Sequence, residues 1–259
     1  MPGLIVAHNY GFFSCCSIKL HYIIKFFNEN KRLPLNVYSK KMFEWYKVNT
    51  ESDITYEYFE HYNQFENIYY YKNIDYHENF QYINYRNINY QSISPFIKKY
   101  FSPSIEVKKI ISRIEDKYQI NYDNICVLFY RGNDKNTETT ICEYDEYIKM
   151  AKSILKNNSN IRFLIQSDET EFIFLILKEF PNNSFYFNDE IRHMKKCMDT
   201  VDKVNKEKID IYSKNYLAIT IIMSKCNYII CGSGNCSIWI MLYRGNINNV
   251  FQNNGISWY

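Results

Sequence analysis

The sequence contains little glycine and proline. Only 7 Gly and 5 Pro occur among 259 residues, whereas Tyr and Phe number 26 and 18. The abundant residue types (Tyr, Phe, Asn, Ile and Lys) share AT-rich codons, so the composition indicates an AT-rich source such as a large DNA virus, a protist or a low-GC bacterium. With 46% apolar and 23% charged residues, the chain is expected to fold around a sizeable core.

Metal-binding patterns are missing as well. The eight cysteines form no Cys-x-x-Cys pair, and the five histidines show no ligand spacing to them. Cysteines in apolar runs, such as Cys126 and Cys226, are therefore expected to be buried reduced thiols. No Asp-x-Asp motif occurs, and the nearest sequence, Glu143-Tyr144-Asp145, is expected to be a solvated helix start. We expect neither a bound metal nor a cofactor.

Targeting and membrane signals are also missing. The N-terminal sequence MPGLIVAHNYG has no basic region, and no run approaches the roughly 20 apolar residues that cross a bilayer. We therefore expect a cytoplasmic protein without a membrane span. The net charge of +3 is too small, and the basic residues too scattered, to indicate a nucleic-acid partner. Base stacking by the Tyr-rich region 55–91 stays a minor alternative.

The first half of the chain opens with a strand, a Gly-containing loop and a helix. An apolar run at 4–7 is followed by apolar residues at helical spacing over 18–27, and a second strand is expected at 35–38. Residues 51–91 show neither clear periodicity nor a repeat. Two helices are expected to follow, one at 95–101 with Ser94 as N-cap and Pro95 in its first position, and one at 105–118 capped by Ser102 or Ser104.

The second half alternates strands and helices. Apolar runs predict strands at 124–130, 162–166, 184–187 and 228–231, and helical periodicity predicts helices at 144–156, 169–179, 212–224 and 238–243. This alternation is typical of a parallel sheet with helices on both faces. Ligands of such sheets bind beyond the carboxyl ends of the strands.

Three loops at such strand ends carry polar chemistry. Arg131 follows a buried strand and is suited to bidentate phosphate binding, with Gly132 allowing close approach and with Asp134 and Lys135 beside it. Ser167 and Asp168 end the next strand, where they suit either a helix N-cap or a hydrogen bond to a nucleotide base or ribose. The third loop precedes an apolar helix and suits an anion; its residues are Gly232, Ser233, Gly234 and Asn235. Together the loops predict a nucleotide diphosphate site.

With these residues in view, the chain resembles the fucosyltransferase superfamily of α1,6-, α1,2- and protein O-fucosyltransferases. FYRGNDK is similar to that family's H-x-R-R-x-D motif, with Arg131 and Asp134 matching, Phe129 in place of the His and Gly132 in place of the second Arg. FLIQSDETEFIFLILKEFPNNSFYF and LAITIIMSKCNYIICGSGNCSIWI resemble the later strand-and-loop segments of the family. HNYGFFSCCSIKLHYII looks like its first loop; the residues there that would face the donor are Gly11, Phe12, Phe13 and Ser14.

The resemblance implies an α/β, GT-B-like fold with two Rossmann-like domains facing a cleft. Residues 1–120 would form the acceptor-side domain and residues 121–259 the nucleotide-sugar-binding domain. It further implies a metal-independent transfer, with GDP-fucose as the leading donor candidate and a glycan or glycoprotein as acceptor. In that reading Arg131 binds the β-phosphate, and Asp168 contacts the guanine or ribose.

The expected mechanism is an inverting single displacement. Arg131, Lys135 and the glycine-loop amides would meet the negative charge of the leaving diphosphate. Glu138 is our first choice for the general base and Asp134 the second. Two alternatives stay open: a related transferase that uses another sugar nucleotide, and a catalytically degenerate module that binds nucleotide sugar or glycan without turnover.

Overall fold

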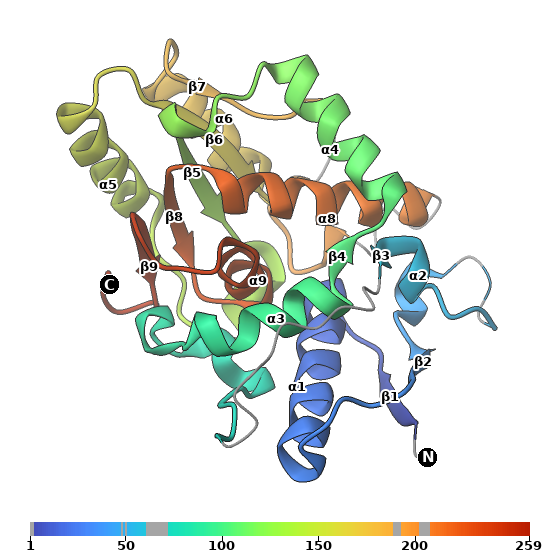
Figure 1. The fold of residues 1–259 in the computed structure, drawn as a ribbon. Coiled ribbons are helices and arrows are strands. Elements are labelled where there is room, and N and C mark those ends of the chain that lie inside the picture. The colour runs from blue at the N-terminus through green and yellow to red at the C-terminus, as the bar shows by residue number, and fades with distance from the viewer. Residues whose placement is uncertain (1–2, 48, 50, 61–71, 189–192, 202–207) are drawn as a thin grey trace.

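The computed structural model describes residues 3–47, 49, 51–60, 72–188, 193–201 and 208–259 (Figure 1). It is a mixed α/β structure with three sheets. β1 (Leu4–His8) and β2 (Val37–Met42) pair in parallel, and β3 (Phe59–Glu60) and β4 (Ser102–Pro103) pair antiparallel. The third sheet has five strands and organises the second half of the chain.

All neighbouring strands of the five-stranded sheet are parallel, in the order β7-β6-β5-β8-β9. The strands are β5 (Ile125–Tyr130), β6 (Arg162–Ser167), β7 (Ser184–Phe185), β8 (Tyr228–Gly232) and β9 (Val250–Asn253). The chain runs outward from β5 to β7 and then returns to build β8 and β9 on the other side of β5. The topological switch point, where ligands bind in such sheets, therefore lies between the carboxyl ends of β5 and β8.

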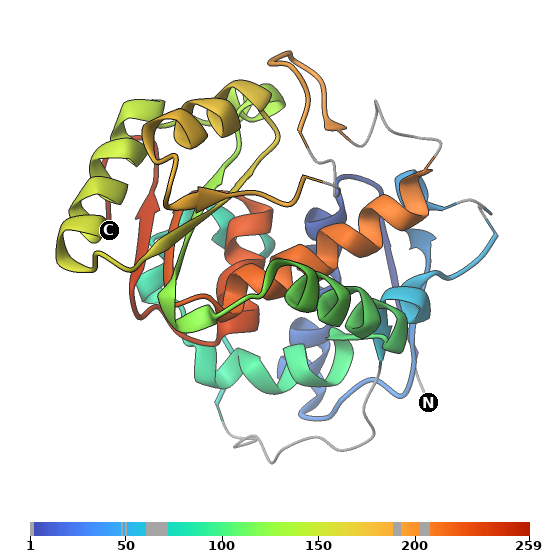
Figure 2. The ribbon, with the colours of Figure 1, turned by 90° about the horizontal axis from the view of Figure 1, so that it is seen from above.

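Helices cover both faces of this sheet, as the alternating sequence pattern predicts (Figure 2). Side chains of β5 point alternately to the two faces. Cys126, Leu128 and Tyr130 join a core with α5 (Tyr144–Asn157) and α6 (Thr170–Glu179). Ile125, Val127 and Phe129 join the larger core on the opposite face, together with α4 (Ile105–Tyr118), α8 (Ile209–Lys225) and α9 (Asn235–Arg244).

The larger core continues without interruption into the first half of the chain. It includes residues of α1 (Phe12–Asn30) and α3 (Tyr90–Tyr100) together with residues of α8 and α9. In the described part of residues 1–120, the parallel sheet consists of β1 and β2 alone. The remaining short elements are α2 (Thr55–Tyr58) and the 3-10 helices η1 (Glu44–Tyr46), η2 (Glu78–Tyr82), η3 (Tyr85–Asn87), η4 (Tyr122–Asn124) and η5 (Asn133–Thr137).

Several predicted boundaries are wrong. α3 begins at Tyr90, because the Asn89 side chain caps it by accepting from the Ser92 amide; Ser94 is not the cap, and Pro95 lies inside the helix. β2 begins at Val37, because Leu35 is exposed and outside the pairing. α1 begins at Phe12, so the first loop is shorter than predicted, and β9 was not predicted.

Two local predictions, the cap of α4 and the solvated start of α5, are confirmed. Ser104 caps α4, and its Oγ accepts a hydrogen bond from the Val107 amide at 3.3 Å. Glu143 and Asp145 are exposed at the start of α5. Among the described residues, no helix combines the length and the apolar character needed to cross a membrane.

Candidate functional site

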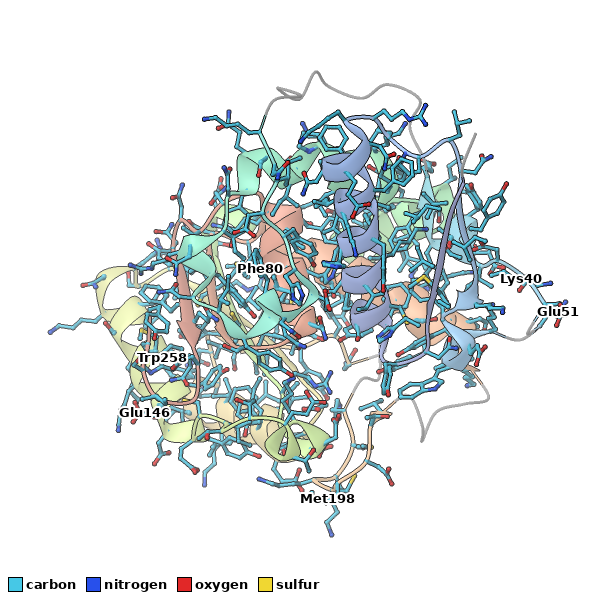
Figure 3. All side chains as sticks on the ribbon, turned by 90° about the horizontal axis from the view of Figure 1, so that it is seen from below. Lys40, Glu51, Phe80, Glu146, Met198 and Trp258 are labelled. Carbon is cyan, nitrogen blue, oxygen red and sulfur yellow. The ribbon has the colours of Figure 1, made fainter. Side chains whose placement is uncertain are left out.

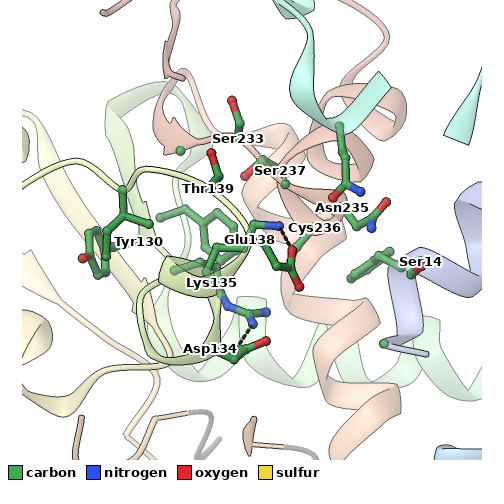
Figure 4. Close-up of a pocket in the computed structure, with 18 of the residues that line it drawn as sticks. Ser14, Tyr130, Asp134, Lys135, Glu138, Thr139, Ser233, Asn235, Cys236 and Ser237 are labelled. Carbon is green, nitrogen blue, oxygen red and sulfur yellow. Dashed lines mark hydrogen bonds and ion pairs between the residues drawn. The ribbon is translucent and has the colours of Figure 1, made fainter. Parts of the chain in front are cut away.

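A cavity of about 280 Å³ lies at the switch point, close to the lower limit of roughly 300 Å³ for small-molecule sites (Figure 4). The loops after β5 and β8 and the start of α1 form its walls. Most of the sequence-predicted site residues line it: Gly11, Phe12, Phe13, Ser14, Arg131, Asp134, Lys135, Glu138, Gly232, Ser233, Gly234 and Asn235. Ser167 and Asp168 do not line the cavity and lie behind Arg131.

Arg131 is held between two carboxylates. Its Nε donates to Asp168 Oδ2 at 2.8 Å, and its Nη2 donates to Asp134 Oδ1 at 3.0 Å. Asp168 is only 3% exposed and also accepts from the Gly132 amide at 2.9 Å. These contacts fix the guanidinium while 28% of the Arg131 side chain stays exposed. The arrangement is suited to presenting a fixed cation to an anionic ligand.

The charges of this group are coupled. Burial by itself lowers the pKa of Arg131, but neighbouring groups, Asp168 foremost and then Tyr216 and Asp134, more than compensate, so the pKa is raised well above its usual value and the guanidinium stays charged. Burial raises the pKa of Asp134, and Arg131 only partly opposes this. Asp134 is therefore a better proton acceptor than an exposed aspartate.

The space beside Gly132 is filled by the side chain of Glu169. A Cβ on Gly132 would lie 2.1 Å from Oε1 of Glu169. Glu169 is fully buried and accepts from the Asn133 amide at 2.8 Å and from the Tyr144 hydroxyl. Gly132 therefore leaves room for a carboxylate that holds the loop, and Arg131 has no neighbouring arginine at the next position.

A second cation, Lys135, lines the same cavity as Arg131. Lys135 pairs with Glu138 through Nζ and Oε2, and its Nζ lies 5.4 Å from the centre of the Tyr82 ring. Lys135 is largely buried, whereas the Glu138 side chain is 46% exposed. The Cε atom of Lys135 lies 3.3 Å from the position that a Cβ on Gly234 would take. The lysine therefore reaches the loop after β8. Two loops far apart in sequence thus share one cationic site.

The loop after β8 leads into the first turn of α9. Helix starts present backbone N–H groups that lack partners within the helix, and they favour anions. Gly234 precedes the helix with φ of +156°, in a conformation that side-chain-bearing residues rarely adopt. Tyr85 supports the loop, because its hydroxyl accepts from the Gly234 amide at 3.0 Å and lies 3.2 Å from the Gly234 carbonyl. The Ser233 hydroxyl accepts a hydrogen bond from Gln252 Nε2 and donates one to the Asn253 carbonyl.

The start of α1 closes the cavity from the first half of the chain. Gly11 is its N-cap, and a Cβ there would meet no atom within 4 Å. Ser14 Oγ lies 2.9 Å from His8 Nε2, whereas Phe12 and Phe13 are buried and pack among aromatic rings. Phe12 and Phe13 thus form the floor of the site, and Gly11 and Ser14 its edge.

The sequence analysis did not predict the three exposed aromatic residues of the cavity wall. Tyr10, Trp45 and Tyr82 line it and are all more than a third exposed. The Tyr10 and Trp45 ring centres lie 6.1 Å apart. Tyr10 lies in the predicted first loop, but in so Tyr-rich a sequence the exposure of single aromatic residues could not be inferred from residue type.

No protein-family model matches the chain, and no curated protein matches its sequence. Among solved structures, the chain is similar to NodZ alpha-1,6-fucosyltransferase soaked with GDP-fucose, with a TM-score of 0.60 and 7% identity over 100% of this chain and 98% of that one. NodZ alpha-1,6-fucosyltransferase co-crystallised with GDP aligns with a TM-score of 0.45 and 11% identity, over 65% of this chain and 51% of that one. The first similarity shows a fucosyltransferase-like fold.

Proposed function

We propose that this protein is a metal-independent, inverting glycosyltransferase that transfers fucose from GDP-fucose to a hydroxyl group of a glycan or glycoprotein. In this proposal the fold is a GT-B arrangement, with residues 1–120 on the acceptor side and residues 121–259 binding the donor. The observation that carries it is the position of Arg131, held by two carboxylates at the switch point, opposite the start of α9.

The site fits the charge that develops during transfer. When the bond between the anomeric carbon and the diphosphate breaks, the leaving GDP gains negative charge. Arg131, Lys135 and the first turn of α9 line the same cavity and would stabilise that charge without a metal ion. The fucosyltransferase-like fold, shared with an enzyme solved with GDP-fucose, supports this choice of donor.

The general base is proposed to be Glu138, with Asp134 as the alternative. Both carboxylates are paired with the cations of the site, Glu138 with Lys135 and Asp134 with Arg131. When a diphosphate binds these cations, it competes with the carboxylates for them. Donor binding would thereby release a base for the acceptor hydroxyl, so that the acceptor is activated only when the donor is present.

The acceptor is proposed to be a sugar. Tyr10, Trp45 and Tyr82 expose flat apolar rings at the cavity, and such rings suit the C–H faces of pyranoses. Ser167 and Asp168 are proposed to support the donor site indirectly, because Asp168 binds Arg131 and the Ser167 hydroxyl accepts from the Glu169 amide at 3.0 Å.

Replacing Arg131 by alanine tests the proposal. We expect GDP affinity, measured by isothermal titration calorimetry, and the rate of fucose transfer each to fall about a hundredfold, which corresponds to roughly 3 kcal/mol. Arg86→Ala is the matched control, because Arg86 is exposed and does not line the cavity. GDP binding as tight in Arg131→Ala as in the parent would refute the assignment. Parallel titrations with UDP and dTDP separate the other sugar-nucleotide donors.

A non-catalytic binding module is the second candidate. It is favoured by Phe129, which is buried where the family motif has a histidine. In that case GDP binding would depend on Arg131 as above, but labelled GDP-fucose would give neither transfer to glycans nor slow hydrolysis. Detection of either product decides for the enzyme.

A further inference from the structure

A cluster of potential metal ligands lies outside the cavity, between α1 and η2. His21 projects from the middle of α1, and His77 and Glu78 stand at the start of η2. His21 Nδ1 lies 3.0 Å from Glu78 Oε2, and His77 Nε2 lies 3.4 Å from the same oxygen. One ligand atom from each residue falls within 4.8 Å of the other two.

The short distances in this cluster are not accompanied by hydrogen bonds. His21 Nδ1 and Glu78 Oε2 are both buried, and neither makes a hydrogen bond. Buried polar atoms of this kind are nearly always satisfied in proteins. Two ligand atoms about 2.1 Å from a tetrahedral ion lie about 3.4 Å apart, which is close to the two separations from Glu78 Oε2. The 3.0 Å separation would also suit a hydrogen bond, but neither buried atom makes one, and both separations are compatible with two ligands of a single ion.

We propose that His21, His77 and Glu78 bind one Zn²⁺-like divalent ion, with water as the fourth ligand. Two imidazoles and a carboxylate suit zinc and its first-row neighbours better than Mg²⁺ or Ca²⁺, which prefer oxygen ligands alone. The His77 side chain is 47% exposed, which leaves an open side for the water.

Binding requires one local rearrangement. His77 Nδ1 accepts a hydrogen bond from the Asn79 amide at 3.2 Å, so the ring proton resides on Nε2 when that bond is made. Coordination through Nε2 moves the proton to Nδ1 and exchanges this one long hydrogen bond for a metal bond. The Asn79 amide must then turn away, because it would otherwise face the new Nδ1–H, and this N–H needs an acceptor such as water, as in most metal-bound histidines.

The ion would fasten η2 to α1. η2 packs against α1, and Figure 3 labels Phe80 in the middle of η2. The same short helix carries Gln81 and Tyr82, which line the cavity, whereas none of the three ligands does. The role is therefore structural, supporting one wall of the cavity, and it is independent of the proposed metal-free transfer.

Titration of chelator-treated protein with Zn²⁺ alone tests the site. We expect binding of one ion per chain by calorimetry, a rise in Tm with Zn²⁺ and Co²⁺ but not with Mg²⁺, and visible absorption from four-coordinate Co²⁺. Glu78→Gln and His77→Ala, both at partly exposed positions, should weaken Zn²⁺ binding at least tenfold while circular dichroism stays unchanged. His193→Ala, at a histidine outside the cluster, should bind as the parent does. The proposal would be overturned if the parent did not bind one ion, or if the Glu78 and His77 variants bound Zn²⁺ as tightly as the parent.

Discussion

Asp168 orients the cation of the site instead of contacting the cavity itself. Its carboxylate joins the Arg131 side chain to the Gly132 amide, and the Asn133 side chain donates to its backbone carbonyl at 2.9 Å. Sequence reasoning placed Asp168 at the correct strand end but proposed a base or ribose contact for it. The residue type alone could not decide between binding Arg131 and contacting a ligand, because both roles use the same carboxylate. The position of the Arg131 side chain decides between them.

Gly132 and Gly11 provide a matched pair of glycine tests. Gly132→Ala should lower the free energy of unfolding by roughly 1–3 kcal/mol, because the new Cβ would collide with the buried Glu169 carboxylate. Gly11→Ala should be close to neutral, since its Cβ would meet nothing within 4 Å. Urea unfolding of both variants measures the difference. Equal stabilities would show that Glu169 can move away at little cost.

Lys19 predicts a pH dependence of stability. It is fully buried in α1, with Thr55 Oγ1 at 3.4 Å from its Nζ, and burial lowers its pKa from 10.5 to about 8, partly offset by Asp53 and Cys16. A lowered pKa means that the folded state disfavours the charged lysine. The free-energy cost of burying Lys19 is therefore absent above pH 10.5. It grows as the pH falls below 10.5, and it is complete once the pH has fallen through about 8.

Lys19→Met should accordingly stabilise the protein at pH 7. The gap between 10.5 and about 8 corresponds to a gain of about 3 kcal/mol at pH 7. The gain should shrink when the same denaturant titrations are run at pH 9.5. A gain that is independent of pH would mean that packing, and not charge, explains the effect.

At the level of elements, the sequence predicts α4 well and α3 poorly. Ser104 stands one residue before an amphipathic run, so both the cap and the helix are local signals. In α3, Pro95 predicts a helix start capped by Ser94, but the helix is capped by Asn89, five residues before Ser94. The buried side chains of Ile93 and Phe96 stabilise the turn that contains the proline. β9 was missed because its four residues become a strand only through pairing with β8.

Removing the α4 cap should have a measurable cost. Ser104→Ala is expected to lower the free energy of unfolding by about 1–2 kcal/mol, because the Val107 amide loses its acceptor and the Glu57 carbonyl loses the hydroxyl that donates to it at 2.8 Å. Thermal unfolding measures the change. Ser159→Ala, at an exposed turn position, is the control and should change the stability little.

The candidate site was predictable where it follows the parallel sheet. Arg131 and Gly234 could be placed together because both follow strands whose carboxyl ends meet at one edge. The aromatic wall and the Glu169 carboxylate under Gly132 could not, since each depends on tertiary packing between segments distant in sequence. The order of the strands therefore determines where the cationic residues of the site lie, whereas tertiary packing determines where its aromatic wall and the Glu169 carboxylate lie.

For the molecule as a whole, the continuous core predicts a single cooperative unit. Side chains of α1 and α3 share the larger core with α8 and α9, so neither half can lose its packing without exposing the other. We expect one unfolding transition, with coincident midpoints by tryptophan fluorescence and far-UV circular dichroism. Saturating GDP should raise the unfolding midpoints measured by both probes by the same amount. Two separated transitions would show that residues 1–120 and 121–259 unfold independently.

Tyr85 has a consequence for turnover. It is fully buried, and it connects the loop after β8 to the first half of the chain through Gly234 and through Gln252, whose Oε1 accepts from its amide at 2.8 Å. A rigid-body rotation of one half relative to the other would break these hydrogen bonds beside the loop after β8. Product release is therefore expected to proceed without a hinge motion between the two halves of the chain.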